Sequence, residues 1–447
     1  MQIKNKVEQA FQNDFWKKLI KNVTTVLVGN SGSSIINFFV TLIMIHALGN
    51  TKYGIFLLAL QYMNLLDGII NFQSWAGVIK YGSEAIVDND EKRLLSIFKS
   101  GFMIDIITAV LGTLVAVIIL PAISYILKWD NELVFLAMIF SVEIVFHIEG
   151  TSVGVLRLFE KFHLTATQSI IAATIKFMLI GIYVLLGGSS LIIITILYVI
   201  TDVIKHLILV FMAMRVLHEK IGIRKVLKTP IKRFDKAFFK YTIWTNVGYT
   251  VDVPVRYFDV FIIGQISVEM VAIYKVFKQM IQILSMLVNP ISMAILPQFS
   301  ELVAKGKEKE AYQKVMKLRN MIFSVGWIVI VASLLVGKPL FNMFLGTEYG
   351  DNLFLFMTIL IMQIFFIAHV AVHPFFASLG KAKEDFIITL SSNIIYIVVA
   401  FVLVTSMGIY AVVLSNVVQG TLCIFMKIWY TKKWLRLRQH NNKNYGV

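Results

Sequence analysis

Residues 250–265 read TVDVPVRYFDVFIIGQ and place three charged side chains inside a segment that is otherwise apolar enough to span a membrane. Asp252, Arg256 and Asp259 follow one another at spacings of four and three residues, and Tyr249 extends the same helical face backwards. A charged group at mid-bilayer costs about 2.5–3.5 kcal/mol on insertion scales, so such side chains usually face water or a partner. The chain is therefore expected to enclose a polar cavity within a membrane.

The composition indicates a polytopic membrane protein. Of 447 residues, 58% are hydrophobic and 15% are charged, whereas a soluble domain is about 45–50% apolar and about 25% charged. The net charge of +16 is also typical of nucleic-acid binders. Here, however, the basic residues lie between the apolar segments, as cytoplasmic loops require, so no nucleic-acid partner is expected. The single cysteine, Cys423, allows no intramolecular disulfide and no thiolate metal cluster.

Apolar windows of about 20 residues, the length that crosses a hydrocarbon core of about 30 Å, predict an all-α protein with twelve transmembrane helices. The windows cover residues 23–47, 54–78, 101–120, 133–155, 165–187, 190–214, 241–264, 270–296, 320–340, 352–376, 385–405 and 408–430. Residues 1–22 lack the apolar core of a signal peptide and instead predict an amphipathic helix at the membrane surface.

Lys and Arg are concentrated on the side of the membrane that holds the N-terminus. Only Lys52, Lys128 and Lys338 fall in connections on the other side. Because positively charged loops remain in the cytoplasm, both termini are predicted to be cytoplasmic. The external connections are short, and none is large enough to form an extracytoplasmic catalytic domain.

The two halves of the chain look related. The predicted parts are a cytoplasmic N-terminus (1–22), an N-terminal six-helix bundle (23–214), a basic linker (215–240), a C-terminal six-helix bundle (241–431) and a basic tail (432–447). Ser83-Glu84 follows the second span, and Ser300-Glu301 follows the eighth. Because six is even, both bundles enter from the same side, which predicts a pseudo-two-fold axis along the membrane normal and a central cleft.

Arg256 is the main candidate for binding an anionic group of a substrate. The alternative is an internal salt bridge that only fixes helix packing. Pro254 removes a backbone donor and predicts a kink beside these charges. Lys275 and Lys278, in the eighth span, either add positive charge to the same cleft or extend to the lipid head groups. Lys176, in the fifth span, either joins them or pairs with an acid on a neighbouring helix.

The first span carries an uncharged polar stripe that suits sugar hydroxyls. Asn30, Ser34, Asn37 and Thr41 recur at spacings of four, three and four residues. Tyr249 belongs to the same set of candidates for substrate binding. Small polar side chains also mediate close helix packing in membranes, so this alternative stays open for the stripe.

Four carboxylates are candidates for ion coupling. Asp252, Asp259, Asp67 and Glu143 all lie in predicted spans. A desolvated carboxylate has a raised pKa and can exchange a proton near neutral pH, and it can also bind Na⁺. For Asp252 and Asp259, a salt bridge is the alternative.

Histidines accompany some of these acids. His147 lies one turn after Glu143, and His206 shares a face of the sixth span with Asp202 and Lys205, which are expected to neutralise each other. These groups are interpreted as helix packing or as further candidates for carrying a proton.

No metal and no cofactor are predicted. His369 and His373 have the i, i+4 spacing of a zinc pair, but no third ligand or general base accompanies them. The chain contains no G-x-x-x-x-G-K-[ST], H-E-x-x-H or G-x-S-x-G motif. An enzymatic activity is therefore not predicted, and ATP hydrolysis by a phosphate-binding loop is excluded.

Short motifs flank the first, seventh and eighth spans: Leu48-Gly49 with Tyr53-Gly54, Ile262-Ile263-Gly264 with Ala272-Ile273-Tyr274, and Leu296-Pro297 with Ser300-Glu301. These motifs resemble those of the oligosaccharide flippases of polysaccharide biosynthesis. With the length and the two halves, they resemble the O-antigen or capsular repeat-unit translocases of the multidrug/oligosaccharidyl-lipid/polysaccharide exporter superfamily. Asp259 stands where many of these proteins have an acidic residue, whereas Arg256 matches no family motif.

The resemblance implies export of an undecaprenyl-diphosphate-linked oligosaccharide to the outer leaflet of a bacterial plasma membrane. Alternating access by a monomer, beside a polysaccharide polymerase and glycosyltransferases, is the expected mode of action. A cation-coupled multidrug antiporter would favour a more acidic cavity, and a lipid II flippase commonly has fourteen spans. A membrane-embedded glycosyltransferase or polymerase would need a larger external loop. A purely structural scaffold would leave the polar helix faces unexplained.

Overall fold

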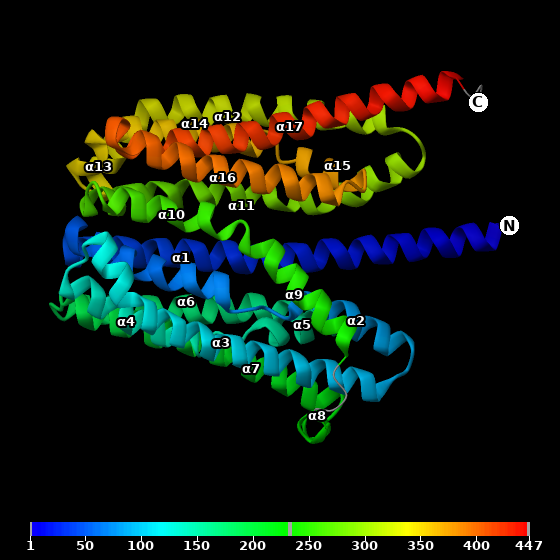
Figure 1. Ribbon diagram of the computed structural model, residues 1–447, viewed down its shortest axis with the longest axis horizontal. Coiled ribbons are helices and arrows are strands. Elements are labelled where there is room, and N and C mark those ends of the chain that lie inside the picture. The colour runs from blue at the N-terminus through cyan, green and yellow to red at the C-terminus, as the bar shows by residue number, and fades with distance from the viewer. Residues whose placement is uncertain (1, 231–234, 445–447) are drawn as a thin grey trace. The chain divides into compact units, whose positions relative to one another are not determined.

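The computed structural model describes residues 2–230 and 235–444, and every regular element in these ranges is an α-helix (Figure 1). Side chains are described between residues 24 and 436, except at 25, 26, 30, 231–234, 287, 289–294, 297 and 382. The side chains of the predicted amphipathic segment, residues 1–22, lie outside this part, so its amphipathic arrangement remains a prediction.

The chain divides into two compact units, Met1–Val253 and Pro254–Val447. The first contains α1 (Gln2–Ile70), α2 (Trp75–Val87), α3 (Glu91–Leu127), α4 (Asn131–Ile144), α5 (Gly150–Leu158), α6 (Phe162–Leu185), α7 (Leu191–Lys220), α8 (Ile223–Lys228) and α9 (Lys236–Thr250). The second contains α10 (Val253–Gly264), α11 (Val268–Ala304), α12 (Glu308–Phe344), α13 (Thr347–Asp351), α14 (Leu353–Ala368), α15 (Val372–Ser378), α16 (Ala382–Met407) and α17 (Ile409–Asn444).

The boundary between the units lies after α9, whereas the sequence placed it in residues 215–240. The reason is that α9 packs on α2 within the first unit. Phe238 is fully buried and meets the ring of Tyr81 edge-on, with 6.2 Å between the ring centroids. Farther along α9, Asn246 accepts a hydrogen bond from the N–H of Gln73 (2.8 Å) and donates one to the carbonyl of Gln73 (3.1 Å).

The predicted all-α membrane class is confirmed, but the count of twelve unbroken spans is not. Among the described residues, eight helical segments are long and apolar enough to cross a membrane, and one of them, Leu27–Val87, covers two predicted spans. Within it, Gly49 has a φ of 73°, a left-handed conformation that glycine adopts at no steric cost.

Four predicted spans are broken into two helices each. The breaks lie at residues 71–74, 145–149, 251–252 and 369–371. The third of these immediately precedes α10 and Pro254, in agreement with the kink that this proline predicts. Irregular backbone is tolerated at membrane depth only where protein or water satisfies its polar groups. The breaks are therefore the places where polar side chains are needed.

Apolar packing positions the breaks in each unit. In the first unit, Val78, Phe98, Val155 and Leu217 belong to one buried cluster contributed by α2, α3, α5 and α7. In the second unit, the buried ring of Phe277 on α11 contacts aromatic rings of α12, α13 and α14.

Candidate functional site

The break between α1 and α2 is held by side chains of neighbouring helices. The N–H of Phe72 donates to Oγ1 of Thr108 (3.1 Å), and the N–H of Ser74 donates to Oδ1 of Asp105 (3.2 Å). These are the backbone donors that lose their helical partners at the break. Their replacement bonds make an interrupted helix compatible with a membrane interior.

Asp105 on α3 joins the first turns of two helices. Its Oδ1 accepts from Ser74, and its Oδ2 accepts from the N–H of Thr151 at 2.6 Å. The hydroxyls of Ser74 and Thr151 lie 2.7 Å apart, and Asp105 is 1% exposed. Gly150 permits this approach, since a Cβ there would lie 2.6 Å from Oδ1 of Asp105. The carboxylate thus faces the positive ends of α2 and α5.

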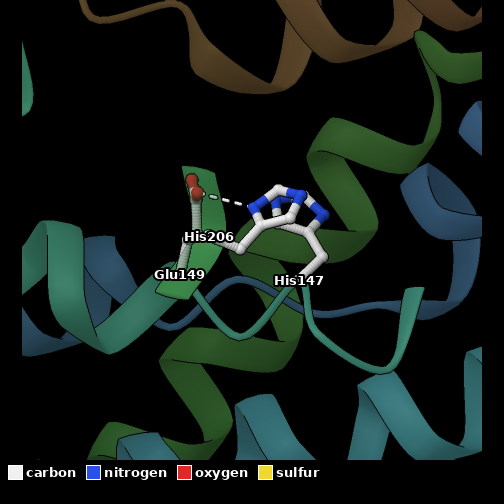
Figure 2. A group of neighbouring side chains, drawn as sticks. All are labelled: His147, Glu149 and His206. Carbon is white, nitrogen blue, oxygen red and sulfur yellow. Dashed lines mark hydrogen bonds and ion pairs between the residues drawn. The ribbon is translucent and has the colours of Figure 1, made fainter. Parts of the chain in front are cut away.

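The break between α4 and α5 carries two ionisable side chains beside a histidine of α7 (Figure 2). His147 directs Nδ1 at Oδ2 of Asp67 (2.7 Å), and His206 directs Nδ1 at Oε1 of Glu149 (2.6 Å). The other ring nitrogen of His206 lies 3.4 Å from Oε1 of Glu143. The two imidazole rings lie 4.6 Å apart at 33°. Two candidates for ion coupling, Asp67 and Glu143, thus belong to one partly buried histidine–carboxylate cluster.

Lys176 borders this cluster and is engaged within the first unit. Its Nζ donates to Oδ1 of Asp202 at 2.7 Å and lies 3.4 Å from the ring centroid of Tyr198. The acid on a neighbouring helix, which the sequence left open as an alternative, is therefore present. Asp202 and Lys205 were expected to neutralise each other; instead, Asp202 forms its ion pair with Lys176.

In the second unit, two predicted site residues pair with each other. Asp259 is fully buried, and its Oδ2 accepts hydrogen bonds from Tyr274 (3.0 Å) and from Nζ of Lys278. Its Oδ1 accepts from the N–H of Val260 at 2.8 Å. The salt-bridge alternative thus holds for Asp259, with Lys278 as its partner. Lys275 is half-buried, one turn before Lys278.

Arg256 is exposed on α10, and within the described part of the chain no hydrogen bond or ion pair of its guanidinium is found. The nearest acid along its own helix, Asp259, is satisfied by Lys278. Asp252 lies half-buried at the end of the first unit. Arg256 therefore keeps its positive charge available to a ligand.

The predicted sugar-facing stripe of α1 is partly buried. Ser34 and Asn37 are half-buried, and Thr41 is 7% exposed. The side chain of Asn30 lies outside the described residues. Ser34 and Asn37 thus remain the accessible members of the stripe.

Tyr249 is 47% exposed and stacks on Trp75, with 6.1 Å between the ring centroids. The exposed guanidinium of Arg157 lies over the same tryptophan, 4.8 Å from its ring centroid. The three side chains come from α9, α2 and α5 and form a layered platform on the first unit.

A model of the family described as polysaccharide biosynthesis protein matches residues 19–303, more than half of the chain. The chain belongs to this family. The match confirms the resemblance that the motifs around the first, seventh and eighth spans indicate.

Two curated relatives support the assignment to the polysaccharide biosynthesis family. The "Inner membrane protein YghQ" of Escherichia coli is 22% identical over 162 residues, which is 36% of this chain and 46% of that protein. The "Putative O-antigen transporter" of Shigella flexneri is 27% identical over 206 residues, 45% of this chain and 48% of that protein. The chain spans about half the length of these relatives.

Solved structures show that this family member has a transporter fold. An inward-facing multidrug resistance MATE family transporter of the MOP superfamily has a TM-score of 0.71 at 11% identity, covering 93% of this chain and 96% of that one. The lipid II flippase MurJ, in an inward closed conformation, has a TM-score of 0.66 at 15% identity. The match covers 91% of this chain and 87% of that one. The chain is a multi-pass membrane protein with a MATE-like fold.

Sequence reasoning missed three residues of this family member. Asp105 had a visible signal, because it is an isolated acid in the apolar window 101–120. Arg157 and Trp75 had none, since their contact depends on the packing of α5 against α2, which residue spacing does not reveal.

Proposed function

We propose that the chain translocates a polyprenyl-diphosphate-linked oligosaccharide from the inner to the outer leaflet of a bacterial plasma membrane, by alternating access, for cell-surface polysaccharide synthesis. The family match, the O-antigen transporter relative and the similarity to a lipid flippase support this function. The lipid-linked substrate is the finer part of the proposal, and it rests on the chemistry of the side chains that would bind it.

The exposed guanidinium of Arg256, which has no ion pair among the residues that the structure describes, is the observation that carries the proposed substrate. A diphosphate taken from water needs cationic and hydrogen-bonding compensation. Arginine supplies this compensation best, because its planar fork of donors matches phosphate oxygens in a bidentate manner.

The predicted lysines differ in whether their charge is already neutralised by an acid of the protein. Lys176 is bound to Asp202, and Lys278 is bound to Asp259, so both charges are compensated inside the protein. Lys275 forms no ion pair among the described residues. Arg256, assisted by Lys275, is therefore the proposed diphosphate-binding group.

Sugar recognition is assigned to the first unit. An aromatic ring offers an apolar face to the C–H groups of a sugar, and the platform of Trp75, Tyr249 and Arg157 combines such faces with a positive charge. Ser34 and Asn37 add hydrogen-bonding groups on α1.

A deletion strain of the native host, complemented with variants, tests the proposal. Arg256→Ala is expected to abolish surface polysaccharide and to accumulate lipid-linked oligosaccharide in the inner leaflet, at an unchanged protein level by immunoblot. Arg256→Lys should restore part of the polymer, because lysine retains the positive charge but lacks the planar pair of donors that binds phosphate oxygens. Arg215→Ala is the matched control, since Arg215 is exposed in the last part of α7 and forms an ion pair with Glu219 on its own helix.

Normal polymer in the Arg256→Ala strain would remove Arg256 from the mechanism. If deletion left the polysaccharide intact and sensitised the host to cationic drugs, multidrug export would replace the proposed function.

A further inference from the structure

The histidine–carboxylate cluster of the first unit has the composition of a metal site. One ligand atom from each of His147, Glu149 and His206 lies within 4.8 Å of the other two. Figure 2 shows the two imidazoles one behind the other, with the Glu149 carboxylate beside His206. We propose that these three side chains bind a divalent transition-metal ion, with Zn²⁺ as the best fit.

The donor set decides the class of ion. Two imidazole nitrogens and one carboxylate oxygen suit Zn²⁺ and its neighbours in the first transition row, whereas Ca²⁺ and Mg²⁺ prefer oxygen ligands throughout. His206 presents Nδ1 to Glu149, and His147 has its Nδ1 on Asp67, so Nε2 of His147 is the nitrogen left to coordinate. Three protein ligands leave a fourth position of the tetrahedron for water.

A second layer of carboxylates supports both histidines. Asp67 accepts from the non-coordinating nitrogen of His147 (2.7 Å), and Glu143 lies 3.4 Å from the non-coordinating nitrogen of His206. A carboxylate behind a metal-bound histidine fixes the tautomer of the ring and increases its basicity. Here each of the two histidines has one.

The charges of the cluster also call for a cation. Its ionisable groups, the histidines aside, are four acids and two bases: Asp67, Glu143, Glu149, Asp202, Lys176 and Lys205. With neutral imidazoles, the excess is two negative charges in a partly buried region, which a divalent cation neutralises. In addition, Oε2 of Glu143 is buried and has no hydrogen-bond partner among the described residues, and Glu143 is 6% exposed.

The bound ion would connect three parts of the first unit. His147 and Glu149 belong to the break between α4 and α5, His206 belongs to α7, and Asp67 lies near the end of α1. Coordination would therefore add cross-links from this irregular segment to α7, beyond its own backbone hydrogen bonds from the N–H groups of Phe146 and His147. This site does not depend on the identity of the transported substrate.

Metal titration of the purified full chain tests the proposal. The protein is prepared in detergent without a polyhistidine tag, stripped with a chelator and titrated with Zn²⁺, and in parallel with Co²⁺, whose visible absorption reports coordination. One equivalent of Zn²⁺ per chain, with a rise in Tm, is expected. His147→Gln and His206→Gln should each weaken binding at least tenfold and change the Co²⁺ spectrum, whereas the exposed His46→Gln and His163→Gln should leave both unchanged.

Asp67→Asn keeps all three proposed ligands, so it tests the site even if the histidine variants fail to fold. It should weaken metal binding by about 10- to 100-fold, the usual effect of losing a supporting carboxylate. Two protons on the histidines would neutralise the cluster equally well. If the stripped protein binds less than a tenth of an equivalent, or if the histidine variants bind like the wild type, the protons occupy the cluster and the metal site is refuted.

Discussion

At the residue scale, single side chains make the irregular backbone of this protein possible. Asp105 accepts one backbone N–H at the start of α2 and one at the start of α5, and Asn246 bonds both backbone polar groups of Gln73. An unsatisfied buried donor costs about 1–3 kcal/mol, so each such side chain matters more than its size suggests. The sequence marks Asp105 as an anomaly, but which donors it meets depends on tertiary packing.

Removing the Asp105 carboxylate should therefore destabilise the first unit. Asp105→Ala leaves the N–H groups of Ser74 and Thr151 without an acceptor, which we expect to cost about 2–5 kcal/mol. Asp105→Asn retains one acceptor oxygen and should lose less. Unfolding of the purified protein in detergent measures both, with exposed Asp88→Ala as the control. Equal stability of the wild type and Asp105→Ala would contradict a stabilising role for the two hydrogen bonds that Asp105 accepts from Ser74 and Thr151.

Asp235, at the start of α9, should make the stability of the first unit depend on pH. Burial opposes its ionisation, but the hydrogen bond from the N–H of Phe238 and the Arg93 guanidinium outweigh burial and lower the pKa of Asp235. Its stabilisation is therefore full above the unfolded pKa of about 3.9 and is lost as the pH falls through the lower folded value.

Asp235→Ala should accordingly cost about 0.5–2 kcal/mol at pH 7 through loss of the helix cap and ion pair. The difference from the wild type should shrink below about pH 4. Denaturation at pH 7 and pH 3 measures the difference in unfolding free energy between the two proteins. A difference independent of pH would contradict the claim that the ionised form of Asp235 supplies the stabilisation.

At the element scale, the breaks in four predicted spans explain where the polar side chains gather. Hydropathy windows placed apolar segments over all twelve spans, because a window averages over a short interruption. The pairs α4–α5 and α14–α15 occupy the fourth span of each half and both break at histidine-containing segments, 145–149 and 369–371. The break beside Pro254 had a local signal, since proline removes a backbone donor, and Pro374 stands in the same way just after the break at 369–371. The pairing of His147 with Asp67, 80 residues apart, had none.

The approach of α5 to α2 depends on a residue without a side chain. A Cβ on Gly150 would meet the Asp105 carboxylate at 2.6 Å, so Gly150→Ala should force the helix starts apart and cost about 1–3 kcal/mol. Gly248→Ala is the matched control, because a Cβ there meets nothing within 4 Å, and alanine is favoured over glycine in a helix by about 0.5–1 kcal/mol. Thermal unfolding compares the two; a stable Gly150→Ala protein would show that the approach is not tight.

At the scale of the whole molecule, composition and hydropathy predicted an all-α membrane protein, and the short motifs around the spans resembled those of the polysaccharide flippases. The family match and the solved structures confirm the membrane class and the family. The division into two units was predicted at residues 215–240 but lies at Val253, because α9 packs with the first unit. Among the predicted cations, residue spacing could not separate Lys176 and Lys278, which form ion pairs, from Arg256, which forms none within the described part of the chain.

Translocation by the purified protein tests the central claim most directly. The wild type and Arg256→Ala are reconstituted into vesicles that carry a polyprenyl-diphosphate-linked oligosaccharide, and an impermeant glycosidase or lectin reports the fraction of sugar on the outer face over time. The account predicts that the wild type redistributes the lipid well above protein-free vesicles, whereas Arg256→Ala does not. Redistribution by Arg256→Ala at the wild-type rate, or none by the wild type, would contradict it.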